Sequence, residues 1–219
     1  MAKQRSGLNA LALVIVARYA MAQGMHYMNG VERAHRLLIE SVLVTIVWAG
    51  LPRQWPISFT ILLSLALAHG INLVVNGHLF SLFKHDLYWF GFYKKWDDFS
   101  GYVEGIQHRL ATHPCAGLQT AEIYGSLTRG KFGPDSDLDI RFIAKPGVWN
   151  AFIVCNRVWA ERIHALLTGF PIDIYMFRDQ NETAKKMNLK KEKPLVVYDF
   201  ADPSASLPFR KRVPSPEIQ

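Results

Sequence analysis

Residues 125–139 read GSLTRGKFGPDSDLD, and this stretch constrains the fold more than any other part of the chain. It joins a Gly-Ser turn to two aspartates, Asp137 and Asp139, that are separated by one residue. On a β-strand the side chains of residues i and i+2 point to the same face, so these carboxylates would lie side by side. Such a pair needs a nearby cation, and its hard oxygen ligands suit Mg²⁺. Backbone N–H groups of the turn could bind a phosphate.

The residues on either side of this motif predict regular structure in a fixed order. Residues 118–124 read as a strand that enters the turn, and residues 138–142 alternate apolar and charged side chains. That alternation is typical of a strand buried on one face. Residues 148–168 have apolar side chains at helical spacing and end before Gly169, a residue typical of a helix C-terminus.

Residues 170–177 read as a further strand that carries a third acid. Ile172 and Ile174 would take one face of this strand and Asp173 the other. A third carboxylate on a neighbouring strand is what a two-metal phosphoryl-transfer site requires. The alternative is a loop with ordinary surface acids, but it does not explain acids that interrupt apolar strands.

This pattern resembles that of the DNA polymerase β-like nucleotidyltransferase superfamily, in particular its small minimal nucleotidyltransferase branch. That pattern is a Gly-Ser pair, a spacer, Asp-x-Asp and an acidic residue on a later strand. The matching residues are Gly125, Ser126, Asp137, Asp139 and Asp173. The resemblance covers residues 96–178 and implies an α/β (α+β) domain whose small mixed sheet is flanked by helices.

The resemblance also implies roles for individual residues. The three aspartates would be catalytic and would hold two Mg²⁺ ions, or Mn²⁺ in their place. Gly125 and Ser126 would contact the phosphates of a nucleoside triphosphate, either ATP or CTP. Arg129 and Lys131 would contact the triphosphate too, or would belong to a solvated basic loop.

The N-terminal half of the chain is much more apolar than the motif region. Residues 57–75 carry no formal charge, and at 1.5 Å per residue a helix of this length nearly spans a hydrocarbon core. Residues 34–51 are also apolar but include Glu40. The two stretches predict a transmembrane helical hairpin within residues 34–80. A buried hairpin of a soluble domain is the alternative, and it would need a large partner core.

Polar residues interrupt both stretches of the predicted hairpin. His69, Asn72 and Asn76 share one helical face in the second stretch, and Glu40 lies in the first. Polar groups in a span face another helix or a cavity. We expect hydrogen bonds between the helices, with a polar seam for a lipid headgroup or another subunit as the alternative. A homo-oligomer therefore stays open.

Basic residues indicate which side of the membrane the motif occupies. Arg33 precedes the hairpin, Arg36 lies at its start and Lys84 follows it, whereas Arg53 lies in the short connection. Because basic residues favour the cytoplasmic side, we expect a multi-pass protein of the cell membrane with a cytoplasmic catalytic domain. Residues 8–22 are a further apolar stretch, which we interpret as interfacial, or as a span only if the N-terminus starts outside.

The remaining segments complete the expected organisation. Residues 81–95 are rich in aromatic residues and lysines, as membrane-interface segments are, and we do not expect nucleic acid as a partner. The expected division is an interfacial or short membrane segment at 1–33, the hairpin at 34–80, the aromatic linker at 81–95, the catalytic domain at 96–200 and a tail at 201–219.

Composition agrees with a membrane-associated protein that handles anions. The formal net charge is +7, 50% of residues are hydrophobic and 20% are charged. A basic balance suits anionic lipids and a triphosphate substrate. Cys115 and Cys155 have no metal-ligand spacing and predict no disulfide framework.

Together these features predict an enzyme, a membrane-anchored and metal-dependent nucleotidyltransferase. It would move a nucleoside monophosphate from a nucleoside triphosphate to a membrane-associated acceptor and release pyrophosphate. The acceptor would be a lipid phosphate, a lipid-linked sugar or another envelope precursor, because the bilayer would concentrate both partners. The alternatives are a non-catalytic membrane regulator that binds a nucleotide or a partner, a protein-modifying (AMPylating) enzyme, and a toxin–antitoxin component.

Overall fold

The computed structural model describes residues 21, 25, 28–76, 96–131, 136–187, 189 and 192–202. The expectations for the aromatic linker at 81–95 and for the chain from residue 203 onward concern residues outside these ranges. The same holds for residues 8–22, apart from Met21.

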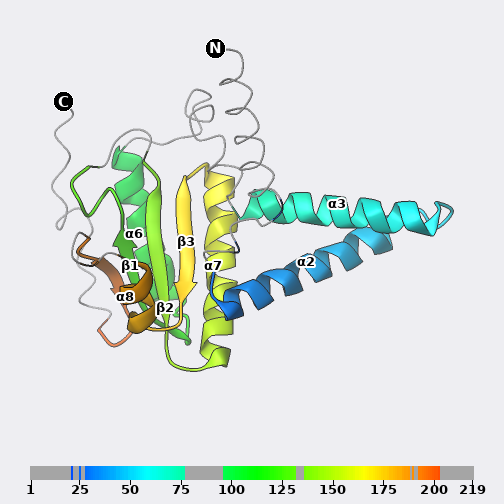
Figure 1. The fold of residues 1–219 in the computed structure, drawn as a ribbon. Helices are drawn as coiled ribbons and strands as arrows, with labels where there is room; N and C mark the ends of the chain where they lie inside the picture. The colour runs from blue at the N-terminus through cyan, green and yellow to red at the C-terminus, as the bar shows by residue number, and fades with distance from the viewer. Residues whose placement is uncertain are drawn as a thin grey trace, which may run out of the picture.

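A four-stranded mixed sheet forms the centre of the C-terminal part of the chain (Figure 1). Its strands are β1 (Leu118–Tyr124), β2 (Leu138–Ala144), β3 (Ile172–Phe177) and β4 (Leu195–Asp199), in the order β3-β2-β1-β4. Strands β2 and β3 are parallel, and the other two pairs are antiparallel. The predicted strands are therefore confirmed, and the sheet is mixed as expected.

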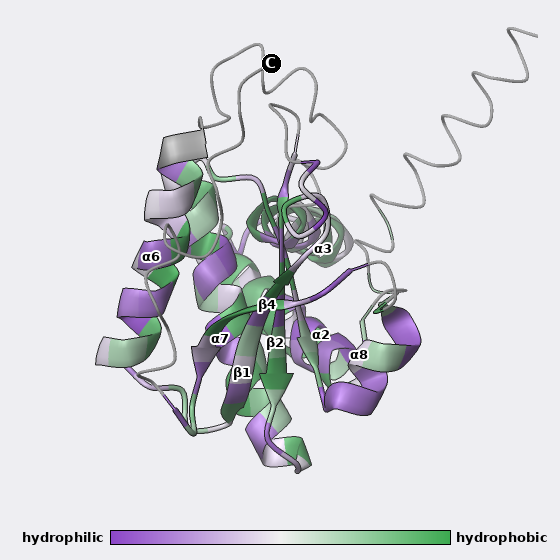
Figure 2. Cartoon of the chain, turned by 90° about the vertical axis from the view of Figure 1, so that its left-hand side faces the viewer, coloured by the Kyte–Doolittle hydropathy of each residue, from purple (hydrophilic) through white to green (hydrophobic). Residues whose placement is uncertain are grey.

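Two helices cover one face of this sheet. They are α6 (Trp96–Thr112) and α7 (Val148–Thr168), and α7 is the crossover that a parallel β2–β3 pair requires. Figure 2 shows α6 as an amphipathic helix, with hydrophobic and hydrophilic residues on different sides. Leu138 and Ile140 of β2 lie in the same buried core as Val154 and Val158 of α7. Because alternate strand residues point toward this core, the residues between them are left for the other face.

Helix α7 ends where the sequence predicts. Gly169 adopts the left-handed conformation with φ 70°, and its N–H reaches the carbonyl oxygens of Ala165 and Leu166. Glycine takes this conformation without the steric penalty of a Cβ, so the chain can turn sharply into β3.

Helices α2 (Gly30–Gly50) and α3 (Ile57–Val75) form an antiparallel hairpin that projects away from the sheet (Figure 1). Many large apolar side chains on both helices are exposed, among them Leu37, Ile46 and Leu62. Within the part of the chain that the structure describes, α3 alone is long and apolar enough to cross a membrane. Helix α2 carries several charged residues. Of the two expected spans, the described residues therefore support only α3 as a candidate.

The polar residues of the hairpin face one another across the two helices. The Glu40 carboxylate lies 2.8 Å from Nδ1 of His69 and accepts a hydrogen bond of 3.0 Å from Nδ2 of Asn72. Asn76 donates to the Asn72 side chain at 2.5 Å. The predicted hydrogen bonds between the helices are therefore present.

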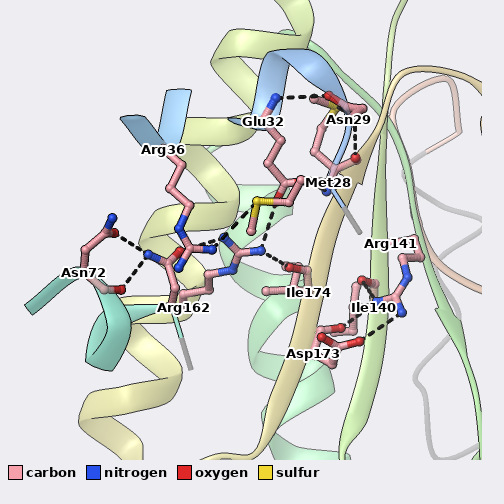
Figure 3. Close-up of polar contacts among 12 residues, drawn as sticks. Met28, Asn29, Glu32, Arg36, Asn72, Ile140, Arg141, Arg162, Asp173 and Ile174 are labelled. Atoms are coloured by element: carbon pink, nitrogen blue, oxygen red, sulfur yellow. Dashed lines mark hydrogen bonds and ion pairs between the residues drawn. The ribbon is translucent and has the colours of Figure 1, made fainter. Parts of the chain in front are cut away.

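The base of the hairpin is bonded to the outer edge of β3. Nδ2 of Asn29 donates to the carbonyl oxygen of Met176 at 2.8 Å, and the Met176 N–H lies 3.4 Å from a carboxylate oxygen of Glu32. Arg162 of α7 donates to the Ile174 carbonyl oxygen at 2.5 Å and to Glu32 at 2.9 Å (Figure 3). An edge strand would otherwise leave these backbone groups unpaired. Residues at the base of the hairpin thus complete the backbone hydrogen bonding at this edge of the sheet.

Candidate active site

Two of the predicted aspartates meet on neighbouring strands. The parallel register of β2 and β3 places Asp139 beside Asp173, on the sheet face opposite the α6–α7 core. Asp137 immediately precedes β2, and its negative charge acts on Asp139. The structure therefore places Asp139 and Asp173 side by side, with Asp137 close enough for its charge to act on Asp139.

The carboxyl group of Asp139 responds to this crowding. Burial, together with the nearby charges of Asp173 and Asp137, raises the pKa of Asp139 to about 7, although Arg141 opposes the rise. A carboxylate in this setting is stabilised by any cation that enters the cluster, because the cation offsets both burial and like-charge repulsion.

The Gly-Ser turn follows β1 directly and lies against the same cluster. Gly125 has φ 79°, and Gly130 has φ 65° further along the turn. The Lys131 N–H closes the turn on the Ser126 carbonyl oxygen at 2.9 Å, and the Thr128 hydroxyl donates to the Gly125 carbonyl oxygen at 3.1 Å. The turn is therefore a compact unit next to the aspartates, as the motif predicts.

A carboxylate that the sequence did not suggest covers this turn. The Gly125 N–H lies 3.3 Å from Oε2 of Glu192, and the Arg129 guanidinium forms an ion pair with Oε1 of the same side chain. Glu192 lies just before β4, far from the motif along the chain, so no spacing pattern could have found it. Its carboxylate contacts two groups that were expected to contact phosphates.

Arg141 is the other site residue that the motif did not identify. Its Nη2 lies 3.0 Å from Oδ2 of Asp173 and 3.6 Å from Oδ1 of Asp139. Figure 3 shows the guanidinium directed at Asp173 from the neighbouring strand. The signal was available in the sequence, because period-2 spacing places Arg141 on the same face as Asp137 and Asp139.

A fourth acid on this face has its own partners. Glu122 of β1 is buried, and its carboxylate accepts hydrogen bonds from the Tyr124 hydroxyl at 2.5 Å, the Thr120 hydroxyl at 3.1 Å and the Gln180 amide at 2.9 Å. Burial, followed by the bond to Glu122, raises the pKa of the Tyr124 hydroxyl. Since three neutral donors satisfy Glu122, it supports the sheet face beside the aspartates.

The carboxylates of the site suit a hard divalent cation, but they are not arranged to hold two ions. The available atoms are carboxylate oxygens, which Mg²⁺ and Mn²⁺ prefer. Among the residues that the structure describes, no three His, Cys, Asp or Glu side chains are grouped so that they could hold a metal ion as they stand. At the aspartate cluster, Nη2 of Arg141 lies against carboxylate oxygens of both Asp139 and Asp173.

Comparison with known proteins agrees with the fold and the motif. Residues 116–196 match the family model described as nucleotidyltransferase domain. This span begins just before β1 and ends within β4, so it contains the turn and all three aspartates. Residues 116–196 are therefore similar to a nucleotidyltransferase domain. No curated protein and no solved structure matches the chain.

Proposed function

We propose that this protein transfers a nucleoside monophosphate from a nucleoside triphosphate to an acceptor at the membrane and releases pyrophosphate. The observation that carries the proposal is the meeting of Asp139 and Asp173 beside the Gly125 turn, within a span that matches a nucleotidyltransferase domain. A fold alone does not define a reaction, so the argument rests on the site.

The chain's own residues would bind and position the reactants. Asp137, Asp139 and Asp173 would hold a divalent cation, Mg²⁺ or Mn²⁺, which when bound would neutralise charge at the reacting phosphate. The Gly125 N–H, Ser126, Arg129 and Lys131 would bind the triphosphate of ATP or CTP. In-line attack by an acceptor oxygen then forms its bond to the α-phosphorus as the bond to pyrophosphate breaks, so positioning is the main task of the protein.

The hairpin supports a membrane-bound acceptor. Exposed apolar side chains on α2 and α3 make a large patch that a soluble monomer rarely tolerates, and α3 meets the length and apolarity of a span. A site held at the bilayer shares a two-dimensional surface with lipid substrates and so gains effective concentration. A lipid phosphate, a lipid-linked sugar or another envelope precursor on the cytoplasmic side is therefore the acceptor class we propose.

The test uses the full-length protein in lipid vesicles with each radiolabelled nucleoside triphosphate, Mg²⁺ and a lipid extract. We expect pyrophosphate release and transfer of label into the organic phase, both lost in Asp137→Ala and Asp173→Ala. Label in the protein band would instead indicate a protein acceptor. No release with any triphosphate would reject the enzyme.

A second candidate function follows from the same site. Arg141 pairs with the aspartates and Glu192 covers the turn, so the groups that should bind metal and phosphate are already bonded within the chain. Such a site, whose polar groups are bonded to one another, is what we would expect of a membrane regulator that binds a nucleotide or a partner without turnover. Nucleotide binding without pyrophosphate release in the experiment above would favour it.

A further inference from the structure

An arginine side chain lies against two aspartates of the cluster. We propose that Arg141 is a built-in cation of the active site, which aligns Asp173 and takes the place of one of two divalent ions, so that the site works with a single ion. This inference rests on the proposed transferase function and defines how its metal site is built.

The guanidinium is fixed by several directed contacts. Its Nη1 donates to the carbonyl oxygens of Ile140 at 2.9 Å and Asp173 at 2.7 Å, and its Nη2 donates to Oδ2 of Asp173 at 3.0 Å. Backbone and side chain of Asp173 are therefore held by one group. A planar guanidinium bonded in this way has little freedom to turn aside.

Burial adds to this fixation. Arg141 is 8% exposed, and the centre of its guanidinium lies 5.1 Å from the ring centre of Tyr175 and 5.9 Å from that of Phe177. Aromatic faces attract a cation at these distances. Moving the guanidinium out would leave Asp139 and Asp173 facing each other without their buried partner, which is strongly unfavourable.

The position of Nη2 limits how many ions the cluster can hold. A second ion would need to bridge Asp139 and Asp173, and Nη2 already lies 3.6 Å and 3.0 Å from their carboxylate oxygens. An ion placed there would meet the guanidinium at contact distance and be repelled by its charge. Oδ2 of Asp139 faces Gly125 instead, on the side where Asp137 and the turn would receive an ion with the triphosphate.

Arg141 thus acts as a positioning residue that also supplies positive charge. One divalent ion and one guanidinium would share the neutralisation that two ions provide in a two-metal site. Lysine would keep the charge but lose the paired contacts, whereas methionine would keep much of the volume and lose the charge. These two substitutions therefore separate the effect of the positive charge of Arg141 from the effect of its side-chain volume.

The experiment counts bound ions in the full-length protein with Mn²⁺ as the probe. Electron paramagnetic resonance measures free Mn²⁺ during titration, with and without a non-hydrolysable triphosphate analogue, and pyrophosphate release is followed on the same preparations with Mg²⁺. We expect one Mn²⁺ per wild-type chain, one in Arg141→Lys and a second, weaker one in Arg141→Met. Pyrophosphate release by Arg141→Met should fall about a hundredfold, because removal of one preorganised hydrogen-bond donor from an active site has an effect of this size.

Two tightly bound Mn²⁺ ions in the wild-type chain would overturn the inference, even if Arg141→Met failed to fold. An unchanged count in a folded Arg141→Met, checked by its thermal unfolding transition, would overturn it as well. Absence of both Mn²⁺ binding and pyrophosphate release in the wild type would reject the transferase function itself. Pyrophosphate release by a wild-type chain that binds two ions would reject only the proposed role of Arg141 and would leave the transferase function standing.

Discussion

The carboxylate of Asp139 lies against the α-carbon of Gly125. A Cβ placed on Gly125 would come within 1.8 Å of Oδ2 of Asp139, and the backbone there has φ 79°. The two halves of the motif, a turn after β1 and an acid on β2, are therefore packed together without room for one more carbon atom. Glycine is needed here for both its conformation and its size.

Substitution of Gly125 by alanine should abolish most of the activity. The new methyl group must displace the Asp139 carboxylate. In addition, a left-handed backbone costs an alanine about 1–3 kcal/mol. We expect pyrophosphate release to fall at least about a hundredfold, since small displacements of catalytic groups have effects of this size. Steady-state kinetics with saturating Mg²⁺ measures it.

Gly130 offers the matched control for this substitution. It also has a left-handed conformation, with φ 65°, but a Cβ there would meet nothing within 4 Å. Gly130→Ala should therefore carry the backbone strain without displacing an aspartate. Equal losses of activity in the two variants would mean that contact with Asp139 is unimportant.

Removal of the Glu192 charge should tighten the binding of a nucleoside triphosphate. The carboxylate contacts the Gly125 N–H and the Arg129 guanidinium, the same groups that phosphate oxygens would use. In Glu192→Gln the triphosphate no longer competes with the Glu192 carboxylate. We expect the KM for the triphosphate to fall about tenfold, which corresponds to about 1.4 kcal/mol of binding free energy. Initial rates over a range of triphosphate concentrations give this value.

Asp199→Asn provides the comparison for Glu192. Asp199 is a carboxylate of β4 that accepts a hydrogen bond from the Ala201 N–H, and its neutralisation should leave KM unchanged. A higher KM in Glu192→Gln would show the opposite role, in which Glu192 holds Arg129 ready for the phosphate.

The buried Arg162 should contribute strongly to stability. It is 7% exposed and bonds to Glu32, to Asn76 of the hairpin and to the Ile174 carbonyl oxygen on the edge of β3. Arg162→Met removes the ion-pair partner that is bonded to the buried Glu32, so we expect a loss of about 3–5 kcal/mol in the free energy of unfolding. Denaturant unfolding of detergent-solubilised protein measures this loss.

An ion pair whose arginine is exposed is the reference for Arg162. Arg178 lies 3.7 Å from Glu182, and its side chain is 62% exposed. Exposed ion pairs contribute about 1 kcal/mol or less, so Arg178→Met should have a small effect. Similar losses in both variants would indicate that the bonds of Arg162 to the hairpin and to β3 contribute little.

Lysines on the outer face of α3 should weaken membrane association. Leu62 is 67% exposed and Leu65 48% exposed on this helix. A lysine within a membrane-spanning helix costs about 3 kcal/mol. We expect the double variant Leu62→Lys with Leu65→Lys to lose most of the fraction that floats with lipid vesicles in a density gradient.

Val148→Lys tests whether this loss is specific to the hairpin. Val148 is 72% exposed at the start of α7, within residues 116–196 and outside the hairpin. A lysine there should leave flotation unchanged. If the hairpin variant floats as well as the wild type, the apolar face of α3 serves another purpose, such as contact with a second copy of the chain.

Local patterns in the sequence determined the secondary structure and the acids of the site. The strand at residues 118–124 and the helix at residues 148–168 occur with the predicted bounds. Period-2 alternation identified the faces of β2 and β3, because side-chain direction along a strand depends only on position. Hydrophobic length likewise identified both hairpin helices, although charges in α2 leave α3 as the candidate span.

Tertiary structure alone decided what surrounds these residues. The pairing of Glu192 with Arg129 and of Arg162 with Glu32 joins segments that are distant along the chain. No local pattern encodes such contacts, because they depend on how the sheet and the hairpin pack. The sequence by itself therefore determined which side chains share a face of the sheet. Only the folded chain decided that a guanidinium would lie against two of the aspartates, since that depends on the register of β2 against β3.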